Sequence, residues 1–218
     1  MIADLAMTNS TTLTTQAARR WLLLILLAAA LLRLWVLADA PPGLTHDEAD
    51  HGITAAAIRD GVHSLYFEIG YGREPLYDYA TAAVMTLLGE NYLAGRVTAV
   101  AFGLLTIVGA FAWTRRAFDT PTALLAAAGL AVGFWPLLTA RQMLRSTALP
   151  GVFVLAAFFF WRDWRLEIGD WVPRVNANLQ SLISNLLPAG VLLGLTFYTY
   201  IPARVLWGVF PSTAVYLW

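Results

Sequence analysis

The sequence contains no cysteine and no lysine, and it has few charged residues of either sign. Without cysteine, the 218-residue chain cannot form disulfides or thiolate metal sites, and cysteine usage does not indicate a redox compartment. All 14 basic residues are arginine and 14 acidic residues balance them, so no basic patch indicates a nucleic-acid partner. Charged residues make up 13% of the chain, against about 25% in a soluble domain, which leaves too little polar surface for a water-soluble fold.

Apolar residues are abundant, at 59% of the chain, and they occur in long runs. The run WLLLILLAAALLRLWVLA, residues 21–38, follows Arg19 and Arg20 and is longer than the apolar core of a signal peptide, which has about 7–15 residues. We interpret it as an uncleaved first span with a cytoplasmic N-terminus and with Arg33 reaching outward to the interface. Further spans are predicted at residues 93–113, 120–139, 147–161, 182–201 and 203–218.

The segment PLYDYATAAVMTLLG, residues 75–89, is the doubtful span because it is short and includes Asp78. Short apolar segments are more often interfacial than spanning. The arginines are divided so evenly between the two sides of the membrane that the positive-inside rule hardly distinguishes a spanning from a non-spanning segment 75–89. Segment length therefore decides, and it favours the non-spanning topology. A non-spanning segment 75–89 would place the polar clusters of the chain together on the outer side of the membrane.

These features predict an all-α fold: a polytopic bundle of transmembrane helices with an outer loop, residues 39–92, that carries short juxtamembrane helices. Residues 1–18 are expected to form a disordered tail, and residues 19–218 one membrane module. Residues 167–181 are predicted to be an amphipathic connector at the inner interface. The chain stops inside an apolar run, which is typical of the N-terminal part of a longer protein.

The densest polar cluster is GLTHDEADHG, residues 43–52. Thr45 and Glu48 have the spacing of a capping box and predict a short outer helix over residues 46–60. Asp47 and Glu48 then fall in the first turn, where the helix dipole favours negative charge. This explanation suits Glu48 better than Asp47, because one cap is already provided.

Three interpretations of Asp47 remain open. It only starts the helix, or it is a general base presented to a cavity at the membrane edge. The third interpretation is a divalent metal site, which no HExxH-like spacing supports. The side chains that would contribute ligands to such a site are Asp47, Asp50, His46, His51 and His63.

Three further polar clusters follow along the chain. YGREPLYDYA has Glu74 and Asp78 four residues apart, which predicts one shared face of a helix that begins near Pro75. TARQMLRSTALP has Arg141 and Arg145 at the same spacing, where they either extend to lipid headgroups or clamp a phosphate. FYTYIPAR, the last cluster, supplies Tyr200 and Arg204 between two apolar runs.

The order of these features resembles the polytopic GT-C glycosyltransferases. A first apolar helix is followed by the DE pair of Asp47 and Glu48, by EPL from Glu74, and by ARxxLR at residues 140–145. The pattern is most similar to bacterial relatives of the dolichyl-phosphate-mannose protein mannosyltransferases and of the lipid A aminoarabinose transferase. The motifs are short, and their order and spacing over residues 19–210 carry the resemblance.

The resemblance implies a multi-pass enzyme of the inner (plasma) membrane with its active site on the outer face. Such an enzyme passes a sugar from a polyprenyl-phosphate donor to a lipid, glycan or protein acceptor, with inversion. It implies that Asp47 is the general base, with Glu48 as the second catalytic residue. The residues expected to bind substrate are Glu74, Asp78, Arg141, Arg145, Tyr200 and Arg204.

The sequence departs from the family pattern at two places. Relatives often have a basic residue before the proline of the second cluster, where this chain has Glu74, and some have an aspartate near residues 145–147, where this chain has RST. No metal ligands are therefore assigned, and a divalent metal cofactor is left open. The alternative function is a non-catalytic transporter or lipid-handling protein, which the scarcity of charges within the spans disfavours.

Overall fold

The computed structural model describes residues 14–69, 72–160, 179–209 and 211–212. In this part of the chain the regular elements are all helical, and one isolated bridge joins Phe67 to Arg73. The predicted all-α class is therefore confirmed. The elements are α1 (Thr15–Leu34), α2 (His46–Arg59), α3 (Leu76–Leu88), α4 (Tyr92–Ala117), α5 (Thr120–Val132), α6 (Phe134–Thr139), the 3-10 helix η2 (Arg145–Thr147), α7 (Ala148–Phe160), α8 (Leu179–Thr196) and α9 (Ala203–Leu206).

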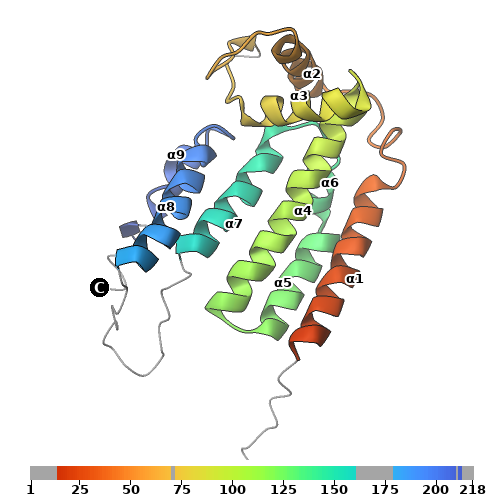
Figure 1. Ribbon diagram of the computed structural model, residues 1–218. Coiled ribbons are helices and arrows are strands. Elements are labelled where there is room, and N and C mark those ends of the chain that lie inside the picture. Colours follow the sequence, from red (N-terminus) through yellow and green to blue (C-terminus); the bar gives the residue numbers. More distant parts are fainter. Residues whose placement is uncertain (1–13, 70–71, 161–178, 210, 213–218) are drawn as a thin grey trace, which may run out of the picture.

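Helices α1, α4, α5, α7 and α8 form one bundle, and helices α2 and α3 cover one end of it (Figure 1). Within the bundle, α4 packs against α1, α5 and α7, and α7 packs against α8. At the covered end, α3 lies across the bundle against α4 and η2, and α2 packs on α3 (Figure 1). The segments 46–60 and 75–89 therefore form short helices outside the bundle, as the sequence predicts.

The first helix differs from its prediction at both ends. It begins at Thr15, inside the segment predicted to be a disordered tail, because the Thr14 side chain accepts a hydrogen bond from Ala17 N at 3.2 Å and caps the helix. It ends at Leu34, and Val36 then has a positive φ of 51°. The rest of the predicted tail, residues 1–13, and the connector over residues 167–178 lie outside the described residues.

The predicted span 120–139 is interrupted at Gly133, which separates α5 from α6. The break leaves backbone carbonyls at the end of α5 without helical partners. The Arg33 guanidinium fills the break, with Nη1 donating to Ala131 O at 2.9 Å and Nη2 donating to Leu130 O at 3.0 Å. The prediction that Arg33 reaches outward is therefore wrong: its side chain is fully buried and supports the neighbouring helix.

The remaining predicted spans agree with the structure to different extents. Helix α7 matches 147–161 closely. Helix α8 begins three residues and ends five residues earlier than the predicted span 182–201, and it contains Pro188. Of the span 203–218 the structure describes the short helix α9, while residues 213–218 lie outside the described part. Among the described helices, α4 alone is long and apolar enough to cross a membrane by length and composition.

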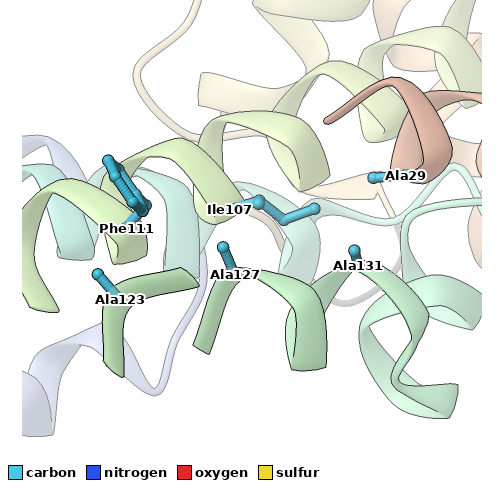
Figure 2. Close-up of a cluster of buried hydrophobic side chains, with 6 residues drawn as sticks. All are labelled: Ala29, Ile107, Phe111, Ala123, Ala127 and Ala131. Carbon is cyan, nitrogen blue, oxygen red and sulfur yellow. The ribbon is translucent and has the colours of Figure 1, made fainter. Parts of the chain in front are cut away.

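Small residues hold the centre of the bundle together. Helix α5 presents Ala123, Ala127 and Ala131 at a spacing of four, so all three lie on one face. Figure 2 shows this alanine face against Ile107 and Phe111 of α4. Alanines permit close approach of helix backbones, and this tight contact sets the position of α4 on which α3 rests.

Met143 connects the bundle to its cover. Its side chain is buried between α2 and α4, beside Gly52 and Gly95. A Cβ atom at Gly95 would overlap the Met143 side chain, and one at Gly52 would lie 3.3 Å from its Cε atom. Glycine at both positions therefore allows the Met143 side chain to pack between α2 and α4.

Candidate functional site

The four polar clusters come together at the covered end of the bundle (Figure 1). Met143 N donates to Glu48 Oε1 at 3.0 Å and joins the third cluster to the first. Leu76 N donates to Tyr198 O at 2.9 Å and joins the fourth cluster to the second. This convergence is the arrangement expected if segment 75–89 lies outside the bundle.

An ion-paired triad joins three of these clusters. Arg145 Nη1 lies 3.2 Å from Glu74 Oε2, and Arg204 Nη2 lies 3.8 Å from Glu74 Oε1. We call these three side chains the Glu74 triad. The Arg145 guanidinium also lies over the Tyr200 ring, 5.6 Å from its centroid. The Glu74 side chain is only 4% exposed whereas that of Arg204 is 63% exposed, so the triad has a buried carboxylate and an outward-facing guanidinium.

The arginines of the Glu74 triad have hydrogen-bonding capacity to spare. Arg145 Nη1 donates to Gly72 O at 3.2 Å, and the Arg204 guanidinium donates no hydrogen bond within the described part of the chain. Each guanidinium carries five N–H donors in a planar fork that suits carboxylates and phosphates. The triad can therefore bind an anion at its exposed side.

Glu74 and Asp78 do not share a helix face as predicted, because Glu74 precedes α3 and only Asp78 lies within it. Asp78 is fully buried, and its Oδ1 lies 2.5 Å from Nδ1 of the buried His51. This pair ties α3 to α2. Asp78 is consequently not accessible to a substrate in this structure.

Tyr77 adds a second buried polar contact beside that pair. Its hydroxyl donates to Gly95 O of α4 at 2.7 Å, and its ring meets the His51 ring edge-on. Burial above all, and then the nearby carboxylates of Asp78 and Glu48, raise the pKa of Tyr77 well above its ordinary value. The phenol stays neutral and serves as a structural donor.

Asp47 lies in the first turn of α2 with an exposed side chain. Its carboxylate makes no hydrogen bond or ion pair with the residues that the structure describes. Asp50, one turn further on, is engaged: its Oδ2 accepts from Arg73 Nη2 at 2.9 Å and lies 3.5 Å from His46 Nδ1. Asp47 is therefore the carboxylate of α2 that is free to accept a proton.

Glu48 forms the predicted capping box with Thr45 and also contacts Arg96 and Met143. Its Oε2 accepts from Thr45 N at 3.0 Å, and its Oε1 lies 3.5 Å from Arg96 Nε and accepts from Met143 N. The side chain is 1% exposed. Because both oxygens are engaged and buried, the geometry gives Glu48 a structural role and not the predicted catalytic one.

Arg141 and Arg145 do not share a helical face, because the chain between α6 and η2 is not helical. Arg141 Nη1 donates to Leu32 O at 2.7 Å and to Arg33 O at 2.9 Å, and its Nη2 donates to Ala40 O at 2.8 Å. The guanidinium thus satisfies carbonyls where α1 ends. Burial, and to a lesser extent the charge of Arg96, lowers the pKa of Arg141.

Sequence reasoning assigned no role to Arg73 and Arg96, although the structure buries both at the covered end. Arg96 Nη1 donates to Leu37 O at 2.9 Å and Arg73 pairs with Asp50, so each arginine links segments distant in sequence. A single arginine near the outer end of an apolar run was the signal available for Arg96. Nothing in the sequence indicates its partner.

The histidines of the metal interpretation are dispersed. His51 is paired with Asp78, and His63 stacks on Tyr79 with ring centroids 6.3 Å apart. Among the described residues, no group of three or more His, Cys, Asp or Glu side chains is placed to hold a metal ion. A metal therefore cannot be assigned to side chains in the described part of the chain.

Comparison of the chain with protein-family models, with curated proteins and with solved structures finds no match.

Proposed function

We propose that this chain is a membrane glycosyltransferase of the GT-C type. In this proposal α4 crosses the bilayer, and the shorter apolar helices α5 and α7 lie in it beside α4. Large apolar side chains are exposed along α1, including Trp21, Leu24, Leu27 and Leu31, and contact with lipid would explain their exposure. The N-terminus is cytoplasmic, and α2 and α3 cover the outer end of a multi-pass bundle.

One observation carries the proposal: an unpaired carboxylate and an anion-binding triad lie at the same end of the bundle. Asp47 is exposed on α2, and the Glu74 triad, which includes Arg204, is held beside the start of α3. Glycosyl transfer from a phosphate-linked donor needs these two functions together, namely a base for the acceptor and cations for the leaving group. A structural membrane subunit would need neither.

The proposed reaction assigns a role to each group. Asp47 accepts the proton of an acceptor hydroxyl while that oxygen attacks the anomeric carbon from the side opposite the leaving group. The bond between the anomeric carbon and the phosphate oxygen breaks, and its electrons stay on the polyprenyl phosphate. Arg145 and Arg204 stabilise the charge that develops there, which is where preorganised electrostatics contributes most. The acceptor is a lipid, glycan or protein hydroxyl on the outer face.

The structure revises the set of residues that we propose to contact substrate. Arg141 is assigned to the end of α1, and Asp78 and Glu48 to the packing of α2 and α3, because their polar atoms are already engaged. The residues retained at the substrate site are Asp47, Glu74, Arg145, Tyr200 and Arg204.

The competing function is a lipid-handling protein or transporter without chemistry. The Glu74 triad alone would serve such a protein, because binding a lipid phosphate requires cations and no base. Asp47 is the residue that separates the two functions.

Replacing Asp47 with asparagine tests the proposal. Asp47→Asn keeps the shape of the side chain but cannot take the acceptor proton, so transfer of a labelled sugar from a polyprenyl-phosphate donor should fall about 10²–10⁴-fold. Binding of the carrier should be retained. Asp60→Asn is the matched control, because Asp60 is an exposed aspartate at the other end of the same helix.

The outcomes separate the two functions. A large loss of transfer in Asp47→Asn, with normal transfer in Asp60→Asn, supports the enzyme. If Asp47→Asn transfers sugar at the normal rate, Asp47 is not the base. If the unaltered protein transfers no sugar but Arg204→Gln weakens its binding of a prenyl phosphate, the lipid-handling alternative is correct.

A further inference from the structure

The charges of the Glu74 triad do not cancel. Arg145 and Arg204 contribute two positive charges and Glu74 one negative charge, so the linked group carries a net charge of plus one. The neighbouring Arg73 is balanced by Asp50 at 2.9 Å and adds nothing to this sum. An anion with a single negative charge therefore neutralises the triad, whereas a second negative charge has no counterpart.

The Glu74 carboxylate lies where its negative charge acts on an anion bound to the triad. Its oxygens are buried, and neither accepts a hydrogen bond from the described residues with good geometry, although both lie near the guanidinium groups. Water therefore does not screen this charge as it screens an exposed one. The exposed Arg204 guanidinium lies 3.8 Å from the carboxylate, so an anion bound to Arg204 also interacts with the Glu74 charge.

The lipid-linked donor and the lipid product of the proposed reaction differ in the charge of the phosphate group. The sugar donor is a phosphodiester, which carries one negative charge. The product is a phosphomonoester, which carries a charge near minus two at neutral pH because its second pKa is about 6. By reducing the charge of the site from plus two to plus one, Glu74 weakens the attraction of the doubly charged product more than that of the singly charged donor.

We propose that Glu74 weakens binding of the phosphomonoester product more than binding of the phosphodiester donor, so that the product is released after transfer. This inference rests on the proposed function. It gives a reason for a carboxylate, rather than a basic residue, at the position before Pro75.

Electrostatics makes the proposal quantitative. Coulomb energy is proportional to the charge of the ligand, so if Glu74→Gln raises affinity for a singly charged anion by a factor f, it raises affinity for a doubly charged one by f squared. An interaction of about 1.4 kcal/mol corresponds to a factor of about ten. The preference for the monoester over the diester should therefore rise by the same factor f in the variant, which is about tenfold for an interaction of this size.

Two probes with the same hydrocarbon chain measure this preference: geranylgeranyl monophosphate and its methyl phosphodiester. Their affinities for the purified full chain in mild detergent are compared at neutral pH for the unaltered protein and for Glu74→Gln. Glu90→Gln is the matched control. Glu90 is exposed, lies at the covered end of the bundle and pairs with Arg59, which is not part of the triad. Arg204→Gln lowers the site charge by one and should shift the preference towards the diester.

The pH supplies a second readout. At a pH of about 5 the monoester loses most of its second charge, so the preference produced by Glu74→Gln should largely vanish. Equal gains for both probes, or a gain that persists unchanged at low pH, would show that Glu74 does not select charge. If neither probe binds the unaltered protein, or if Arg204→Gln leaves both affinities unchanged, the proposed anion site itself fails.

Discussion

Arg141 is the residue for which the sequence and the structure give opposite expectations, and its replacement separates them. The ARxxLR pattern predicts a phosphate ligand, whereas the structure commits both terminal nitrogens to backbone carbonyls at the end of α1. Arg141→Ala should therefore destabilise the fold while leaving binding of a prenyl phosphate intact. The expected cost follows from the hydrogen bonds that are lost.

Four of these bonds are short, and they differ in burial. The bonds to Leu32 O and Trp35 O, at 2.7 and 2.8 Å, are exposed, so water replaces them in the variant. The bonds to Arg33 O and Ala40 O, at 2.9 and 2.8 Å, are part-buried. Counting only the part-buried bonds, at about 1.5 kcal/mol each for a charged donor, predicts a loss of about 3 kcal/mol.

Denaturant unfolding of the purified protein in mild detergent measures this loss, and probe binding is measured on the same preparations. Arg204→Ala is the reciprocal control, because this exposed guanidinium holds nothing together by hydrogen bonds in the described chain. It should keep its stability and lose anion affinity. Arg141→Lys should recover only part of the stability, because lysine lacks the planar fork that reaches several carbonyls. An Arg141→Ala protein of normal stability that no longer binds the probe would refute our assignment.

Two further predictions concern the cover of the bundle. Glu48→Ala should lower the free energy of unfolding by about 3–5 kcal/mol, because it leaves Arg96 buried without its counter-charge. Loss of the helix cap alone would cost only ~1 kcal/mol. Urea unfolding measures the difference, and a loss near 1 kcal/mol would mean that the ion pair contributes little. Since the chain has no native cysteine, Glu90→Cys and Ala117→Cys report topology cleanly. An impermeant maleimide should label position 90 from outside and position 117 only after permeabilisation, and the reverse pattern would show that the covered end faces the cytoplasm.

The local features of this fold could be predicted from the sequence because they depend on neighbouring residues. The capping box of Thr45 and Glu48 fixes the start of α2, and the short segment 75–89 becomes a helix across the bundle end. Both follow from rules that operate within a few residues. The meeting of the polar clusters is also predictable, because a segment 75–89 too short to join the bundle leaves the clusters at one end of it.

The partners of the charged residues could not be predicted, because each pair joins segments far apart in sequence. Glu48 meets Arg96, and Asp78 meets His51, so spacing within one helix gave no information about them. The prediction for Arg141 is wrong for the same reason. Its spacing from Arg145 predicts a shared helical face, but the chain there is not helical and Arg141 reaches the end of α1.

The division between structural and functional charges follows from burial. An ionised group removed from water must be paired, since the cost of leaving it alone in a low-dielectric interior is several kcal/mol. The buried pair of Glu48 and Arg96 obeys this rule and holds α2 in place. Asp47 and the guanidinium of Arg204 are tolerated with few contacts because they remain at the aqueous edge. In the proposed reaction, the groups that take up a proton or bind a phosphate need that freedom, so the proposal places them at the edge of the cover, where charge is exposed and its support is buried.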